Sequence, residues 1–228
     1  MFSRTAHLIR WRQTFILLLA AIALPNVRPT AAIAQVTPSQ LGLETVESDR
    51  TQVTPLENNT YTITGGVVRG VDRDFLFHSF DSFSLDAGQV AEFDTSAIVG
   101  NSGNETVLGR VTGGLESFID GTIRADGVSL FLINPRGIVF GPNSALEVGR
   151  SFVASTAESF VFADGSEFSA ITPQAAPLLS ISQPIGLAIG QRSGSIENLS
   201  ITENGLFVSP DNMIALIGNS VTSSGGVI

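Results

Sequence analysis

Residues 121–154 run GTIRADGVSLFLINPRGIVFGPNSALEVGRSFVA. The run at 128–133 is almost wholly apolar, and shorter apolar runs follow it at 138–140, 145–148 and 151–154. Asn134-Pro135-Arg136-Gly137 has the residues that a type I turn favours at its first, second and fourth positions. A strand that is apolar on both faces is typical of a sheet covered on both sides. We therefore interpret three of these strands and three corners, within roughly two dozen residues, as one coil of a parallel β-helix. A meander of hairpins would favour two-residue Asn-Gly or Asp-Gly loops instead.

The same punctuated pattern extends from Asn59 onward. Short runs rich in Val, Ile, Phe and Thr alternate with Gly, Asn, Asp and Ser, which favours strands. The 23 glycines and 10 prolines are too many and too evenly spread for helices. Residues 211–219 (DNMIALIGN) repeat the rhythm of residues 126–134 (DGVSLFLIN), as successive coils of a solenoid do. We predict an all-β fold.

The segment 1–34 has the order of a secretory signal peptide. Three arginines and no acidic residue precede an apolar run, Phe15–Leu24, which Pro25 ends. Ala32 and Ala34 then offer a cleavage site, so we predict export through the Sec machinery and a mature chain that begins at Gln35. A permanent membrane anchor fits poorly, because a helix of this length spans about half of a ~30 Å hydrocarbon core. The segment 35–58 is polar with two prolines, which indicates a linker or an irregular N-terminal cap.

Charge and cysteine content narrow the class of protein. All 12 basic residues are arginines, and four of them lie between Met1 and Ala34. The rest of the chain therefore carries eight positive and 21 negative charges, a net charge of −13. Such a chain repels phosphate backbones, which argues against nucleic acid as a partner. Because cysteine is absent, an exported fold here depends on apolar burial and backbone ladders without disulfides.

One group of charged residues could support catalysis. The acidic residues are densest, with basic residues close by in the sequence, at Asp72, Asp74, Asp81 and Asp86, near Arg69, Arg73 and His78. Parallel β-helices include polysaccharide lyases and hydrolases, and hydrolysis by two carboxylates needs them about 5–10 Å apart. If Asp72 and Asp74 lie in a strand, they share one face of it; if they lie in a loop, they are solvated charges.

Other catalytic patterns are missing from the sequence. His78 is the only histidine that follows Ala34, so a two-histidine metal site is not available. No nucleophile elbow, phosphate loop or zinc pattern occurs. We expect no catalytic residue, no metal and no cofactor, and the alternative is a small β-helix polysaccharide lyase or hydrolase.

Several segments carry a family resemblance, namely Gly65-Gly66, Arg69-Gly70, Phe77–Phe80, Gly109–Gly114, Ile119–Ile123, Leu130–Asn143, Val148–Thr156, Pro184–Leu187 and Gly205–Val208. Together they resemble the haemagglutination-activity domain, the N-terminal secretion domain of filamentous-haemagglutinin-like exoproteins exported by two-partner secretion. The most specific segment, Asn134-Pro135-x-Gly137-Ile138, is similar to the family signature N-P-N-G-I. Arg136 stands where the family has Asn, and Thr112–Ser117 lacks the second signature, N-P-N-L.

The resemblance implies a right-handed parallel β-helix over residues 59–228, with an N-terminal cap and extra antiparallel strands. It implies recognition in the periplasm, while unfolded or partly folded, by an outer-membrane β-barrel transporter, and folding at the cell surface that helps to draw out the rest of the chain. The expected product is secreted or on the cell surface, and its parent is an adhesin whose receptor the sequence does not identify. The motif implied for transporter recognition and secretion comprises Asn134, Pro135, Arg136, Gly137 and Ile138.

The C-terminal end of the sequence indicates whether the chain is a whole exoprotein or part of one. The chain stops at Gly225-Gly226-Val227-Ile228, where another coil would begin, and nothing there resembles a charged or helical cap. Natural proteins cover or charge such an edge. We expect a truncated exoprotein or a fragment of one.

Overall fold

The computed structural model describes residues 35–41, 46–55, 58–100, 102–177, 184–191, 193–201 and 205–224. They belong to one compact unit, Ile33–Ile228, and only this unit is described below. The predicted signal peptide lies outside the described residues. Within them, no helix is long and apolar enough to cross a membrane.

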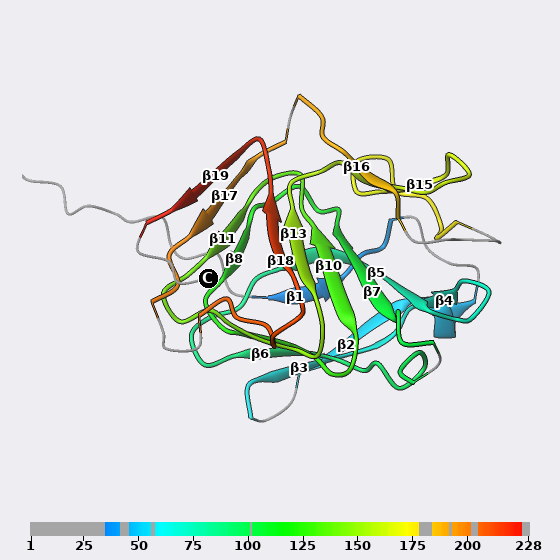
Figure 1. Cartoon of the computed structure of the whole chain (residues 1–228), viewed down its shortest axis with the longest axis horizontal. Helices are drawn as coiled ribbons and strands as arrows, with labels where there is room; N and C mark the ends of the chain where they lie inside the picture. The colour runs from blue at the N-terminus through cyan, green and yellow to red at the C-terminus, as the bar shows by residue number, and fades with distance from the viewer. Residues whose placement is uncertain are drawn as a thin grey trace, which may run out of the picture. The chain divides into compact units, whose positions relative to one another are not determined.

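Strands dominate the described chain and form four sheets (Figure 1). Sheet A contains β1 (Val36–Pro38), β4 (Val67–Arg69), β5 (Phe75–Phe83), β7 (Thr106–Val111), β10 (Ser129–Ile133), β13 (Phe152–Ser155) and β18 (Ile214–Ile217). Sheet B contains β2 (Thr51–Pro55), β3 (Thr60–Gly65), β6 (Val90–Phe93), β9 (Thr122–Ala125) and β12 (Ala145–Val148). Sheet C contains β8 (Ser117–Ile119), β11 (Ile138–Phe140), β17 (Ser195–Asn198) and β19 (Ser220–Ser223), and sheet D contains β14 (Ser159–Val161), β15 (Glu167–Ser169) and β16 (Gly186–Ala188). A short 3-10 turn, η1 (Glu47–Asp49), precedes β2.

Sheets A, B and C are the three walls of a parallel β-helix. The chain visits them in turn, as in β7, β8 and β9 and then β10, β11 and β12, and each strand pairs in parallel with its equivalent one coil away. Leu130 pairs with Val107 in the coil before it and with Phe152 in the coil after it. The predicted coil is confirmed: β10, β11 and β12 make one turn of the β-helix, and β9 and β13 belong to the coils before and after it. The predicted repeat at 211–219 is also confirmed, because β18 joins β13 in the same sheet as β10.

The core lies inside the coils. Alternate residues of each strand point inward, and register stacks them in rows such as Leu76–Val107–Leu130–Phe152. All four side chains of that row are buried in one apolar cluster. Between β17 and β18 the described residues add no strand to sheet B, and Leu206 and Val208 fill the core there instead.

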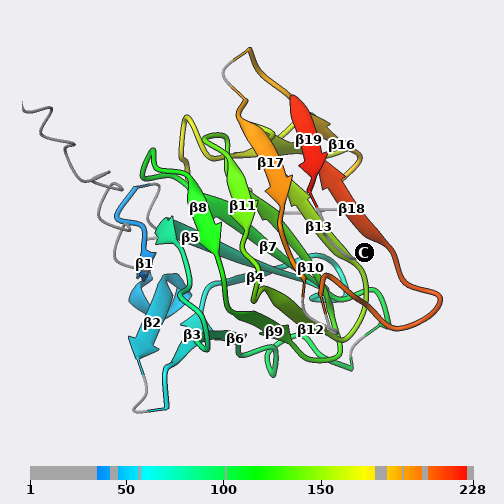
Figure 2. The same ribbon diagram turned by 90° about the vertical axis from the view of Figure 1, so that its left-hand side faces the viewer.

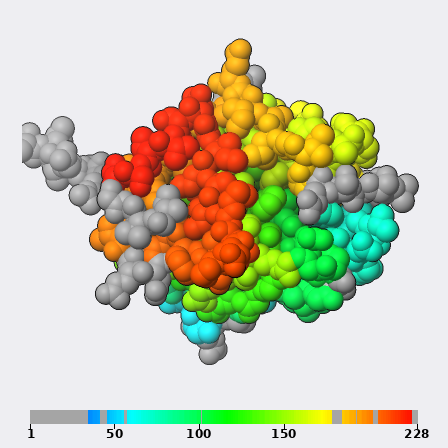
Figure 3. Space-filling view, viewed as in Figure 1, coloured from blue at the N-terminus to red at the C-terminus, as the bar shows by residue number. Residues whose placement is uncertain are grey.

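Sheet D packs outside the β-helix, against the outer face of sheet A. The chain leaves the helix after β13, forms the three antiparallel strands, and returns at β17. Figure 3 shows these residues in yellow beside green residues of the coils. The interface is a second apolar cluster that includes Phe77, Leu108, Ile133, Phe160, Phe162 and Phe168. The extra antiparallel strands implied by the resemblance are therefore present.

Arg110 fastens this outer layer to the coils. Its side chain points outward from β7 and is 1% exposed. The guanidinium donates to Ser79 Oγ at 2.8 Å, to the Ser169 carbonyl at 2.8 Å and to the Gln174 carbonyl at 2.6 Å. It also lies 3.9 Å from the centre of the Phe168 ring, within range of a cation–π contact.

The N-terminal end of the unit is antiparallel. β1 and β4 both pair antiparallel with β5, and β2 pairs antiparallel with β3, so the first coil is bordered by strands from the segment 36–69. The domain boundaries at 34 and 58 stay predictions.

The sequence left open whether Asp72 and Asp74 share one face of a strand, and the structure excludes that arrangement. Both lie in the turn between β4 and β5, where Gly70 and Arg73 adopt positive φ angles of 96° and 58°. Left-handed residues reverse the chain, so the alternation of a strand does not apply there.

His78 is an ionisable group inside the core. It occupies an inward position of β5, with no exposed surface, and packs against the rings of Phe80 and Phe93. Its Nδ1 lies 3.2 Å from Thr51 Oγ1, which also accepts the backbone N–H of Ser79 at 2.9 Å. Burial lowers the pKa of His78 to about 3, and the Asp94 carboxylate offsets only part of this effect.

This histidine predicts a pH dependence of stability. An unfolded histidine has a pKa of about 6.5, so below that pH the unfolded chain takes up a proton that the folded chain refuses. Between pH 7.5 and pH 5.0 the free energy of unfolding should fall by about 2 kcal/mol through this group. Urea denaturation of the wild type and of His78→Leu across that range measures the effect. The variant should lack this component, and parallel pH profiles for the two proteins would contradict the assignment.

Candidate functional site

The corner at residues 134–138 joins sheet A to sheet C and is bonded to neighbouring coils on both sides. The Gly137 N–H donates to the Asn134 carbonyl at 3.1 Å, which closes the predicted turn. The Ser117 N–H donates to the Gly137 carbonyl at 3.1 Å, and the Gly194 N–H to the Pro135 carbonyl at 2.8 Å. One corner therefore holds the coil before it and the coil after it.

The side chain of Asn134 makes the same connection inside the fold. It is wholly buried, and its Nδ2 donates to the Leu115 carbonyl and to Ser117 Oγ, both at 2.9 Å. Its Oδ1 accepts the backbone N–H of Arg136 at 2.9 Å. Because Pro135 disfavours the helical region for the residue before it, Asn134 is restricted to the extended conformation that aims this amide at the previous coil.

Gly137 makes room for an acidic side chain. Its φ is 130°, a conformation that side-chain-bearing residues rarely adopt, and a Cβ atom built there would lie 2.6 Å from Glu116 Oε1. The Glu116 side chain therefore lies across the corner. Burial and, to a lesser extent, the Glu197 carboxylate raise the pKa of Glu116.

Arg136 is the exposed member of the motif. Pro135 and Ile138 are buried, whereas Arg136 faces solvent at the edge of a groove of about 160 Å³. The groove separates the corner from the residues that follow β15 of sheet D, and its lining includes Pro135, Arg136, Glu158, Ile171 and Pro173. The five motif residues thus form one corner, but they do not form one exposed surface.

The sequence did not reveal the partners of this corner. Leu115 and Ser117 lie 19 and 17 residues from Asn134. They belong to Thr112–Ser117, the stretch in which the second family signature was sought and not found. Ser155, whose carbonyl accepts the Asn134 N–H at 2.9 Å, and Gly194 are further away in the chain. Only the length of one coil, which the parallel register fixes, could have indicated these neighbours.

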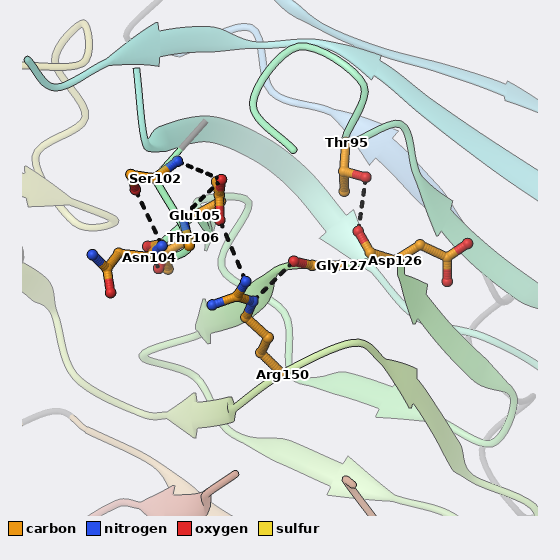
Figure 4. Close-up of polar contacts among 9 residues, drawn as sticks. Thr95, Ser102, Asn104, Glu105, Thr106, Asp126, Gly127 and Arg150 are labelled. Atoms are coloured by element: carbon orange, nitrogen blue, oxygen red, sulfur yellow. Dashed lines mark hydrogen bonds and ion pairs between the residues drawn. The ribbon is translucent and has the colours of Figure 1, made fainter. Parts of the chain in front are cut away.

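A second corner is held by charged and polar groups (Figure 4). The buried carboxylate of Glu105 accepts the N–H groups of Ser102 and Gly103 at 2.9 and 3.1 Å. Arg150 lies 3.8 Å from the other oxygen of Glu105 and donates to the Gly127 carbonyl at 3.0 Å. Glu105, Gly127 and Arg150 precede β7, β10 and β13, which are neighbours in sheet A, so these bonds tie three coils together.

The aspartates considered for catalysis are divided between two ends of one strand. Asp74 precedes β5, whereas Asp81 lies near its end and Asp86 follows it. The extended chain from Asp74 to Asp81 spans about 23 Å, which exceeds the range for a pair of hydrolytic carboxylates. No three His, Asp or Glu side chains of the described residues are grouped so that they could hold a metal ion.

Comparisons with known proteins agree with this architecture. The family model described as TPS secretion domain matches residues 34–228. The chain is also similar to the crystal structure of the HMW1 secretion domain from Haemophilus influenzae, with a TM-score of 0.51 and 18% sequence identity. That alignment covers 84% of this chain and 41% of the other, so this chain spans less than half of that structure. No curated protein matches the sequence.

At 18% identity the structural similarity shows the shared fold, and the family match covers nearly all of the chain beyond the predicted signal peptide. Both agree with the resemblance derived from the motifs at 65–208. The chain belongs to the TPS secretion domain family, the two-partner secretion domains of filamentous-haemagglutinin-type exoproteins.

Proposed function

We propose that this chain is the N-terminal secretion domain of an adhesin, recognised in the periplasm by an outer-membrane β-barrel transporter. The observation that carries the proposal is the family match over residues 34–228. In this proposal the Sec machinery delivers the chain to the periplasm and its signal peptide, residues 1–34, is removed there. The transporter then passes the mature chain to the cell surface.

The burial of the motif supports recognition before folding. Asn134, Pro135, Gly137 and Ile138 are all buried once the coils have stacked, and Arg136 alone of the five is exposed. A transporter that contacts Asn134 and Pro135 must therefore do so while the chain is unfolded or partly folded. After export, hydrogen bonds from the same corner hold neighbouring coils together.

Folding can then contribute to export. Each new coil buries apolar side chains against the previous one and completes its backbone hydrogen bonds, so stacking at the surface opposes return of the chain. The corner at 134–137 supports this role, because its bonds reach both neighbouring coils.

The corner predicts a difference in stability between two neighbouring substitutions. Asn134→Ala leaves the Leu115 carbonyl, Ser117 Oγ and the Arg136 N–H without the amide, and should lower the free energy of unfolding by about 2–3 kcal/mol. Arg136→Ala removes an exposed side chain and should change it by less than about 0.5 kcal/mol. Urea denaturation at pH 7.5 measures both values. Equal losses in the two variants would contradict the corner's role.

The proposed function predicts a loss of export. When the chain is co-expressed with a matching transporter, replacing Asn134 and Pro135 together with Ala should lower the amount released to the medium by about tenfold, equivalent to about 1.4 kcal/mol of lost recognition. Immunoblots of medium and periplasm measure the release. Unchanged release from the double variant would remove the motif from the export step.

A matched control separates recognition from folding. Ile123 is a fully buried core residue of β9, away from the motif, and Ile123→Ala should destabilise the fold by about 2–5 kcal/mol. If the transporter contacts the motif, the Asn134/Pro135 variant should be released less than Ile123→Ala. Equal release from the two variants would assign the motif to folding alone.

A further inference from the structure

The three walls of the β-helix differ on their outer faces. Sheet A is covered by sheet D through the second apolar cluster. Sheet B carries a row of charges in register, Glu92, Arg124 and Glu147, in which Arg124 lies 3.7 Å from Glu92 and 2.6 Å from Glu147. On sheet A the outward apolar side chains are buried, and on sheet B the outward charges in this row are paired.

Among the described residues, sheet C has neither a covering sheet nor a row of paired charges on its outer face. Its outward row in register is Phe118, Val139, Glu197 and Thr222. Phe118 is 43% exposed, and Leu115, in the bend just before β8, is 65% exposed. In Figure 2 strands β8, β11 and β17 lie side by side, and no other described strand crosses in front of them. Most phenylalanines of the described chain are buried, so an exposed ring on a sheet face is unusual here.

Two carboxylates stand beside these apolar side chains. Glu116 lies over Gly137, the residue before β11, and a side chain at that position would collide with it. Glu197 lies on β17, the strand beside β11, and is close enough to contribute to the raised pKa of Glu116. Within the described residues neither Glu116 nor Glu197 has an ion-pair partner, and the Glu197 carboxylate adds to the effect of burial in raising the pKa of Glu116. The contrast is with sheet B, where an arginine stands between two glutamates.

We propose that the outer face of sheet C, formed by Leu115, Glu116, Phe118, Val139 and Glu197, docks a protein segment that presents an arginine or lysine beside apolar side chains. A cation placed between the two carboxylates would supply the charge that this face lacks, and the apolar side chains would cover Leu115 and Phe118. A second copy of the chain fits poorly, since its mature part carries a net charge of −13. An anionic lipid surface is repelled for the same reason.

This inference rests on the proposed function for the identity of the partner. The face exists only after the coils have stacked, which in that proposal happens at the cell surface. The first protein surface that the folded domain meets there is the extracellular side of its own transporter. We therefore assign the docking segment to the transporter's extracellular loops.

Binding of the purified, folded chain to that transporter tests the assignment. The transporter that releases the wild type is reconstituted in phosphatidylcholine nanodiscs, and dissociation constants are measured by biolayer interferometry at 50 and 300 mM NaCl. Glu116→Gln combined with Glu197→Gln should weaken binding about tenfold at low salt and flatten its salt dependence. Phe118→Thr, which keeps a strand-forming residue, should weaken binding about tenfold at both salt concentrations and keep the salt dependence.

Asp72→Asn is the matched control. It removes one exposed carboxylate from the turn between β4 and β5, outside the proposed face. The dissociation constant should therefore stay within about twofold of the wild-type value. Thermal denaturation checks that all variants stay folded; Gln at positions 116 and 197 removes a repulsion and should not destabilise the chain.

The outcomes separate the two proposals. Wild-type affinity in both face variants, or equal binding of the wild type to empty nanodiscs, overturns the docking face and leaves the secretion function standing. Dimerisation that Phe118→Thr abolishes in sedimentation experiments also overturns it, because the face would then belong to a second copy. Failure of the transporter to release the chain at all overturns the proposed function.

Discussion

The parallel strands of the β-helix depend on neighbouring coils for their backbone hydrogen bonds. A parallel coil makes no ladder within itself, so an N–H or carbonyl group that loses its neighbour is left in the interior without a partner. Register between coils is therefore the constraint on which the fold rests. The corner at 134–137 meets it with bonds to Leu115 and Ser117 on one side and to Ser155 and Gly194 on the other. At a different corner, the contact between the charged side chains of Glu105 and Arg150 holds neighbouring coils in register.

A uniform interior permits different exteriors. The inward rows consist mostly of Leu, Val, Ile, Phe and Ala, because each must fill the same width of coil. The outward rows face no such requirement. One carries a second sheet anchored by Arg110, one carries paired charges, and one exposes Phe118 with two carboxylates. What distinguishes this domain chemically from any other stack of coils therefore lies on its outer faces.

The sequence predicted those parts of the fold that local chemistry determines. Pro135 restricts φ, Gly137 permits a positive φ, and a run such as VSLFLI is compatible with a strand covered on both sides, so the coil within residues 121–154 could be recognised without a structure. The partners of Asn134 could not, because they lie one coil away and depend on a register that no single segment encodes. The same holds for Arg110, whose buried contacts to residues 169 and 174 arise from a packed outer sheet. Asp72 and Asp74 were compatible with one face of a strand or with a loop, and only the structure shows that the left-handed Arg73 between them makes a turn.

The two departures from the family signatures have different structural weight. Arg136 replaces the usual Asn at the exposed position of the corner, where the backbone N–H, and not the side chain, bonds to Asn134. The missing second signature lies at Thr112–Ser117, directly against the corner, yet the contacts that Asn134 needs there come from the Leu115 carbonyl and from Ser117 Oγ. A backbone carbonyl is available whatever the side chain, and a serine hydroxyl accepts as readily as other small polar groups. The hydrogen bonds between coils can therefore form without the second Asn-Pro, so the loss of that signature bears on what the unfolded chain presents to a partner more than on the fold it finally adopts.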